Sequence, residues 1–146
     1  MYKTILVAID GSFYSREALP AAIELGKKFD AQLFIVHVAE HDRGRAAAYT
    51  IESPADQTRL VAEAVKQAHD AGVGAKGELI DRAAGHVAAA IAEEAVKNEA
   101  DLIVMGSRGL SDTQGVFLGS VTHRVIQLAD VPVLIARPRK AVAVAR

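Results

Sequence analysis

The chain has 146 residues, a common size for a single domain, and its formal net charge is −1, from 17 basic and 18 acidic side chains. Such a balance provides no global field to attract DNA or RNA, so nucleic acid is not expected as a partner. The absence of cysteine excludes disulfides, thiolate metal ligands and cysteine nucleophiles, and it agrees with a cytoplasmic location. The first apolar run, Ile5 to Ile9, is too short for a signal-peptide core or a membrane span, so neither secretion nor membrane insertion is expected.

Short β-branched runs alternate along the chain with longer alanine-rich segments of helical period, a pattern that indicates βαβ units and a parallel sheet. Most of these runs are continuously apolar, as strands covered on both faces of a sheet must be. The expected strands are residues 4–9, 32–38, 77–80, 101–105 and 132–136.

Helices are expected between the strands, over residues 15–29, 55–71 and 85–98 and from about Gly119 onward. Pro20 is expected in or near the first turn of the first helix, where its missing N–H costs little. The side chains expected to face the core are Ala18, Ala22, Leu25 and Phe29 in the first helix, Leu60, Ala64 and Ala68 in the second, Val87, Ile91 and Ala95 in the third, and Val121, Val125 and Leu128 in the fourth.

The connector over residues 40–54 is longer than most loops in compact α/β units and carries several charges. Two interpretations fit it equally well. It is a lid over a binding site, or it is a surface insertion with no role of its own.

Some apparent motifs have ordinary structural explanations. The run from Gly72 to Gly77 matches G-x-G-x-x-G, but it follows a helix and leads into a strand, the reverse of the dinucleotide-binding context. Gly72 is better explained as the residue just past a helix end. His37, within a strand, is expected to be a hydrogen-bonded core histidine. Ser12 and Ser15 flank a helix start, where capping is the usual role.

The most informative stretch lies between the fourth strand and the fourth helix, where the glycines follow the spacing G-x2-G-x9-G-S. Gly106, Gly109 and Gly119 allow the backbone to approach an anion closely, and the helix beginning near Gly119 adds unpaired N–H groups. Ser120 and Thr122 can add hydroxyl donors. Arg108 can add a charge-assisted contact, and His123 lies in the first turn of the same helix. The pattern predicts a phosphate-binding site.

Three segments carry a resemblance that covers nearly the whole chain: ILVAIDGS at residues 5–12, DLIVMGSRG at 101–109, and GSVT at 119–122 through VPVLIA at 131–136. In these segments the chain resembles a universal stress protein of the ATP-binding branch. The resemblance implies an α/β fold with an open five-stranded parallel sheet of order 3-2-1-4-5 and helices on both faces, Rossmann-like and similar to the adenine nucleotide alpha hydrolases. It also implies ATP at the carboxyl ends of the first and fourth strands, which is where the topological switch point of such a sheet lies.

The same resemblance assigns contacts residue by residue. Asp10 faces the ribose or adenine; Ala8 and Val38 line the adenine pocket; Met105 and Gly106 flank the ribose; Gly109, Gly119, Ser120, Val121 and Thr122 hold the phosphates, beside Arg108. Taken alone, Asp10 would be a turn residue before Gly11. The sequence departs from the family pattern at Asp112 and Thr113, where an added negative charge would either weaken phosphate binding or engage a magnesium ion.

The resemblance also implies a universal stress protein domain over residues 1–138, with residues 139–146 expected to form a flexible tail. It implies a homodimer through the last strand, from Val131 to Arg137, which is an edge strand in the implied order. The favoured function is a regulatory ATP-binding protein of the stress response. The alternatives are a slow ATPase and a signalling protein that binds AMP or cyclic AMP. No catalytic residue or protein-held metal is predicted, because the pattern supplies phosphate donors but no committed base or nucleophile.

Overall fold

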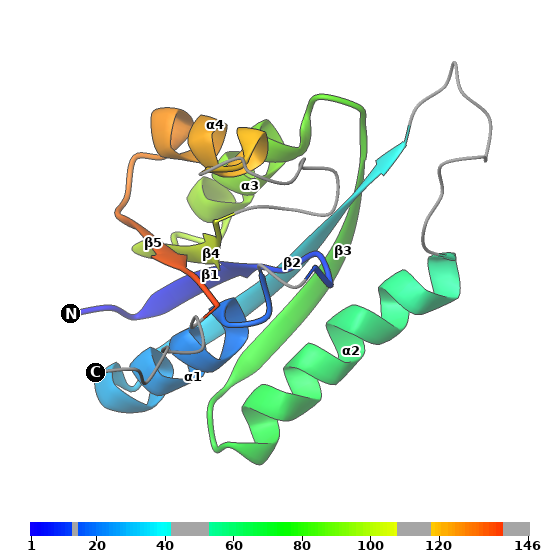
Figure 1. Ribbon diagram of the computed structural model, residues 1–146. Helices are drawn as coiled ribbons and strands as arrows, with labels where there is room; N and C mark the ends of the chain where they lie inside the picture. Colours follow the sequence, from blue (N-terminus) through cyan, green and yellow to red (C-terminus); the bar gives the residue numbers. More distant parts are fainter. Residues whose placement is uncertain (13–14, 42–52, 108–117, 139–146) are drawn as a thin grey trace, which may run out of the picture.

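A computed structural model describes residues 1–12, 15–41, 53–107 and 118–138, which are the coloured parts of the ribbon in Figure 1. Strands and helices alternate throughout this part of the chain. In order, they are β1 (Thr4–Ala8), α1 (Ala18–Phe29), β2 (Gln32–His41), α2 (Pro54–Asp70), β3 (Ala75–Ala83), α3 (Val87–Lys97), β4 (Leu102–Gly106), α4 (Ser120–Leu128) and β5 (Val133–Ala136).

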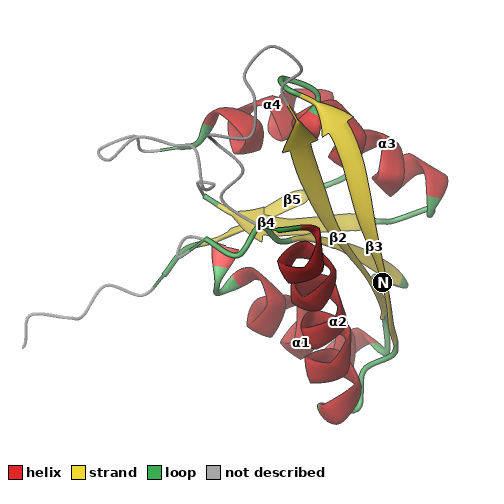
Figure 2. Cartoon of the chain, turned by 90° about the vertical axis from the view of Figure 1, so that its right-hand side faces the viewer, coloured by secondary structure: helices red, strands yellow, loops and turns green. Residues whose placement is uncertain are grey.

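The five strands form one parallel sheet in the order β3-β2-β1-β4-β5, which confirms the expected topology. Figure 2 shows the sheet between two helical layers, with α1 and α2 on one face and α3 and α4 on the other. Each layer encloses its own apolar cluster, and alternate residues of the central strands enter opposite clusters. Because both faces are covered, Ile5, Leu6 and Val7 of β1 are all fully buried.

The chain order reverses between β1 and β4, which are neighbours in the sheet although α1, β2, α2, β3 and α3 separate them in sequence. The β1–β4 register pairs Val7 with Val104, and the β1–β2 register pairs Ala8 with Val36. The carboxyl ends of β1 and β4 therefore lie side by side, next to the middle of β2. This edge of the sheet is the switch point at which open α/β folds bind ligands.

Strands β2 and β3 are longer than their apolar runs predict. Their pairing continues through charged residues as far as His41 opposite Ala83, and Figure 1 shows this two-stranded extension rising beyond the other strands. His41 Nδ1 lies 2.6 Å from Asp81 Oδ1 across the extension. The sequence-based bounds of 32–38 and 77–80 were therefore too short, because the ladder of backbone hydrogen bonds continues after burial ends.

The helix termini follow the expected residue chemistry. Pro20 is the third residue of α1, within its first turn, as predicted. Helix α2 begins after Ser53, whose Oγ accepts a hydrogen bond of 3.1 Å from the amide of Asp56. Beyond the end of α2, Gly72 has a φ of +85°, the left-handed conformation predicted for it.

Gly77, the last glycine of the misleading G-x-G-x-x-G run, lies within β3 and has a packing role. A Cβ added there would be 2.5 Å from Val61 Cγ1 and 2.7 Å from Val65 Cγ2. Helix α2 therefore packs directly on the backbone of β3 at this position. The glycine is explained by close contact between helix and strand rather than by phosphate binding.

The predicted core faces of the helices are largely confirmed, with one correction in α4. Val125 is fully buried and Val121 packs partly buried against the same cluster, but Leu128 remains 38% exposed. Leu128 is the last residue of α4 and lines a shallow groove against α3 instead of reaching the sheet. The helical period placed it on the correct side but could not show that the helix ends there.

Candidate nucleotide-binding site

Asp10 lies immediately beyond the carboxyl end of β1, within a tight turn. Its Oδ1 accepts a hydrogen bond of 2.8 Å from the amide of Ser12, and Gly11 between them has a φ of +78°. This is the aspartate turn that the sequence alone suggested for the residue. An ionised carboxylate has two oxygens and about four acceptor positions. The turn bond is therefore compatible with a second contact from a ligand hydroxyl.

A buried histidine fixes the peptide that precedes Asp10. His37 on β2 is 4% exposed, and its Nδ1 donates to the carbonyl oxygen of Ile9 over 2.8 Å. The Ile9 amide donates in turn to the carbonyl oxygen of Val36 over 2.9 Å. The prediction of a hydrogen-bonded core histidine is confirmed. Because both backbone groups of Ile9 are hydrogen-bonded to β2, the position of the next residue, Asp10, is well defined.

The apolar residues of the predicted site lie on one face of the sheet. Ala8 of β1, Val38 of β2 and Met105 of β4 all belong to the cluster beneath α3 and α4. Ala8 and Val38 are each 9% exposed and Met105 is 5% exposed. These three side chains come from adjacent strands close to their carboxyl ends, so the structure brings together an apolar floor at the switch point.

Two hydrogen bonds join the end of β4 to the start of α4. Thr122 Oγ1 donates to the carbonyl oxygen of Gly106 over 2.8 Å, and the amide of Gly119 donates to the carbonyl oxygen of Ser107 over 2.7 Å. Thr122 is 2% exposed and Gly119 is buried. The first turn of α4 is thereby fixed against the strand, although more than ten residues of sequence separate the two elements.

The N-terminus of α4 has the features of an anion site. Gly119 is the N-cap residue, with no side chain to cap the helix, and the first turn contains no acidic residue. The first helical bond runs from the His123 amide to the Gly119 carbonyl oxygen over 2.9 Å. The amides of Ser120, Val121 and Thr122 therefore precede the hydrogen-bond ladder of the helix, and the helix dipole adds a partial positive charge there.

Within this turn, the hydroxyls differ in what they can offer a ligand. Ser120 is exposed, whereas the Thr122 hydroxyl is buried and donates inward to Gly106. Any contact of Thr122 with a phosphate is therefore expected to come from its backbone amide. The exposed side chain of His123 belongs to the same turn, as expected.

Other predicted features lie outside the described residues. Arg108, Gly109, Asp112 and Thr113 belong to the stretch 108–117, and most of the connector proposed as a lid belongs to residues 42–52. The G-x2-G-x9-G-S motif is described only at its first and last glycines and at the serine that follows. The predicted contacts of Arg108 and Gly109 remain predictions.

Ser12 and Ser15 do not cap α1 itself, which begins after Glu17. Ser12 Oγ instead accepts the Ser15 amide over 3.1 Å, and Ser15 Oγ donates to the Ser12 carbonyl oxygen over 3.3 Å, within the turn that precedes the helix. Both residues are buried, which their polar character did not suggest. The one sequence feature that indicated an ordered turn was their position directly after the first predicted strand.

The described residues contain no group of three or more histidine, aspartate or glutamate side chains placed to hold a metal ion. Among the helices of this part of the chain, none is both long and apolar enough to cross a bilayer.

Comparisons with known proteins point in one direction. Residues 1–137 match the family model described as the universal stress protein family. Universal stress protein YxiE of Bacillus subtilis is 36% identical, over 94% of this chain and the full length of the relative. Universal stress protein MJ0531 of Methanocaldococcus jannaschii is 33% identical, over 96% of this chain and 85% of the relative. Among solved structures, a universal stress protein in complex with cAMP superposes with a TM-score of 0.70 and 29% identity, covering 94% of this chain and 98% of the other.

Proposed function

We propose, because the chain belongs to the universal stress protein family, that the switch-point edge of its sheet binds an adenine nucleotide, with ATP as the preferred ligand. We propose further that the protein acts as a cytoplasmic regulatory module of the stress response. One observation carries the proposal: Thr122 and Gly119 hold the uncapped first turn of α4 against the end of β4, and Asp10 follows β1, the strand that pairs with β4. This arrangement brings anion donors and a carboxylate to one edge of the sheet.

In the proposed pose, the base lies over Ala8 and Val38, and backbone groups of Val38 would pair with the adenine edge. Met105 and Gly106 flank the ribose, and Asp10 accepts from a ribose hydroxyl. The phosphates take the amides of Gly119, Ser120, Val121 and Thr122, together with contacts from Arg108 and Gly109. A magnesium ion would be held by the phosphate oxygens themselves.

The donors at α4 are sufficient for useful affinity. A hydrogen bond to a charged phosphate contributes about 1.5–3 kcal/mol net, so three or four of them can produce micromolar binding after association costs are subtracted. Donors of this kind stabilise phosphate charge without moving a proton. Hydrolysis would further require a base that orients water, so we propose that the protein holds ATP rather than consumes it.

Cyclic AMP is a second candidate ligand, because the structurally similar universal stress protein named above was solved in complex with cAMP. A single cyclic phosphate would use fewer of the α4 amides than a triphosphate does. The base and ribose contacts would be the same. The two ligands therefore differ in how much of their affinity depends on the first turn of α4.

The experiment is mass spectrometry of nucleotide released from the purified protein, followed by calorimetric titration with ATP, ADP, AMP and cyclic AMP. Co-purified ATP and the tightest binding for ATP are the expected results. Preferential binding of cyclic AMP would establish the second candidate instead. If none of the four nucleotides binds, the proposed function is wrong.

We also propose that two copies associate through β5. This strand is an edge of the sheet, paired with β4 on one side only within the described part of the chain, and Leu134 is 40% exposed. An edge strand presents unpaired backbone groups that invite a second strand. In the expected assembly, β5 of one copy pairs antiparallel with β5 of the second copy. Each copy contributes its one domain, residues 1–138.

A further inference from the structure

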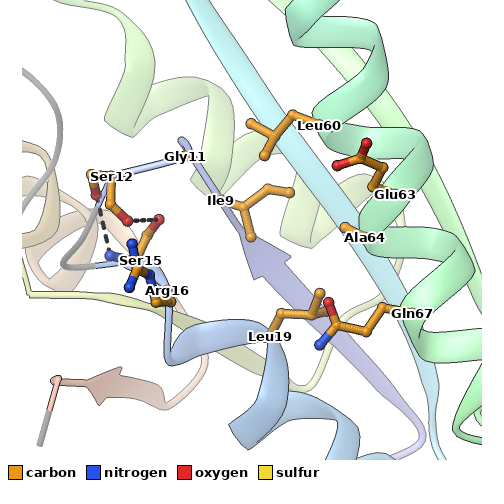
Figure 3. Close-up of a pocket in the computed structure, with 10 residues that line it drawn as sticks. All are labelled: Ile9, Gly11, Ser12, Ser15, Arg16, Leu19, Leu60, Glu63, Ala64 and Gln67. Atoms are coloured by element: carbon orange, nitrogen blue, oxygen red, sulfur yellow. Dashed lines mark hydrogen bonds between the residues drawn. The ribbon is translucent and has the colours of Figure 1, made fainter.

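A cavity of about 200 Å³ lies between α1 and α2, against the face of the sheet opposite to Ala8, Val38 and Met105. Figure 3 shows its walls, which come from the turn after β1, from α1 and from α2. The cavity is too small for a nucleotide, since most ligand pockets exceed roughly 300 Å³, but it has room for a small metabolite.

The middle of the cavity is aliphatic. Ile9 and Leu19 are 8% and 7% exposed, and Leu60 is a partly buried residue packed against the same core cluster. In Figure 3, Ile9 and Leu19 lie between the turn after β1 and the polar side chains of α2. A methylene chain laid along this wall would be removed from water, with a gain of about 0.8 kcal/mol for each buried CH₂.

The end of the cavity at the turn favours an anion. Ser12 and Ser15 line it and are 8% and 6% exposed, and the exposed side chain of Arg16 lies beside them. Ser12 Oγ accepts a hydrogen bond from the Ser15 amide, an arrangement that does not use the hydroxyl proton. Helix α1 begins directly after this turn, so its positive dipole end lies at the same place.

The opposite wall has different chemistry. Glu63 and Gln67, exposed residues one helical turn apart on α2, line the rim of the cavity across from the serines. A carboxylate here attracts an ammonium group and repels a second anion. The two ends of the cavity therefore select for opposite charges, separated by an aliphatic stretch.

From this juxtaposition we propose that the cavity is a second ligand site, specific for a short ω-amino carboxylate. The carboxylate of the ligand accepts from Ser12 and pairs with Arg16. Its methylene chain lies along Ile9 and Leu19, and its ammonium group faces Glu63. The aliphatic wall of this site lies apart from the proposed nucleotide site, because Ile9 and Leu19 belong to the cluster beneath α1 and α2, whereas the amide of Ser12 at the other end donates to Asp10.

The test uses δ-aminovalerate as the probe and follows the methyl resonances of Leu19 and Leu60 by NMR in the full-length protein. We expect saturable shifts, with tighter binding of δ-aminovalerate than of valerate, which lacks the ammonium group, or of pentylamine, which lacks the carboxylate. Glu63→Gln should remove the preference over valerate. Equal affinity for the three compounds, or shifts that do not saturate, would overturn the proposal.

Two α2 variants locate the binding. Gln67→Phe fills the cavity from its rim and is expected to abolish the shifts, whereas Ala62→Phe, on an exposed position of the same helix outside the cavity, should leave them unchanged. Retained binding in folded Gln67→Phe would count against this site. Addition of AMP should not displace the probe. Displacement would assign the cavity to nucleotide binding and refute a separate site, whereas failure of all nucleotides to bind would leave this result unaffected.

Discussion

The hydroxyl of Thr122 donates to the carbonyl oxygen of Gly106 over 2.8 Å, so a side chain in the first turn of α4 is bonded to the last residue of β4. These residues are 16 positions apart in sequence; Gly106 begins the motif that the sequence associated with phosphate binding, and Thr122 lies two residues after its end. The bond is buried and fixes the direction in which the first amides of α4 point. The proposed phosphate site at the start of α4 therefore has a defined orientation relative to β4.

Thr122→Val tests this bond by removing the hydroxyl while keeping the branched shape. The carbonyl oxygen of Gly106 then loses a buried donor, and we expect a loss of about 1–3 kcal/mol in the free energy of unfolding. ATP affinity should fall as well, because the first turn of α4 is no longer fixed. Urea denaturation and calorimetry measure the two effects. Thr122→Ser, which retains the hydroxyl, is the matched control, and equal behaviour of the Val and Ser variants would contradict the assignment.

Gly119→Val tests close approach of a phosphate to the N-cap of α4. Gly119 has φ −64° and ψ 155°, an extended conformation that other residues adopt, so the backbone does not itself require glycine; because the residue is buried, urea denaturation must first show that the variant is folded. Its branched side chain would obstruct the approach of the ligand, and we expect ATP affinity to fall by at least about tenfold, or 1.4 kcal/mol. Gly119→Ala should show a smaller loss. Unchanged affinity in the Val variant, measured by calorimetry, would argue against the proposed pose.

Two substitutions of Asp10 separate its turn bond from its proposed contact with the nucleotide. Asp10→Asn keeps an acceptor for the Ser12 amide, so its stability should stay near that of the unmodified protein. Asp10→Ala loses the acceptor and should lose about 0.5–1.5 kcal/mol of stability. The Ala variant should also bind ATP more weakly than the Asn variant. If calorimetry gives the same ATP affinity for Asp10→Ala and the unmodified protein, Asp10 is a turn residue only.

Gly77→Ala tests the packing of α2 on β3. The new methyl group would overlap Val61 and Val65, whose nearest atoms are 2.5 and 2.7 Å from the position of its Cβ. Overpacking of this kind costs about 1–3 kcal/mol, measurable by thermal or urea denaturation. The control is Gly74→Ala, where the nearest atom is Gln32 Oε1 at 2.5 Å, the end of a flexible side chain on an exposed residue. We expect the control to be close to neutral; the opposite ranking would refute the packing argument.

Leu134→Asp tests the proposed β5 dimer. Two copies of the variant would place like charges near one another across the paired edges, which is destabilising, so light scattering should show a shift from dimer to monomer. Leu79→Asp is the matched control, because Leu79 is similarly exposed, at 36%, on β3 at the other edge of the sheet. A monomeric unmodified protein, or dissociation by the Leu79 variant alone, would exclude dimerisation through β5.

Several elements were predictable because local chemistry specifies them. The apolar run of β1 is continuous because both faces of that strand are buried, and Gly72 marks the end of α2 because glycine tolerates the left-handed conformation. His37 was correctly interpreted as a core residue. The extension of β2 and β3 was missed, since backbone pairing leaves no mark on the side-chain pattern. The exposure of Leu128 was missed because helical period does not show where a helix ends relative to the sheet.

By itself, the sequence determined the alternation of strands and helices, the resemblance to the universal stress proteins and the stretch expected to hold phosphate. These follow from periodicity and residue type, which are local properties of the chain. The tertiary structure decided which groups meet. It placed the Thr122 hydroxyl on Gly106, used one oxygen of Asp10 for the Ser12 amide, and opened a cavity between α1 and α2. Such contacts join residues distant in sequence or depend on backbone direction, so only the packed chain determines them.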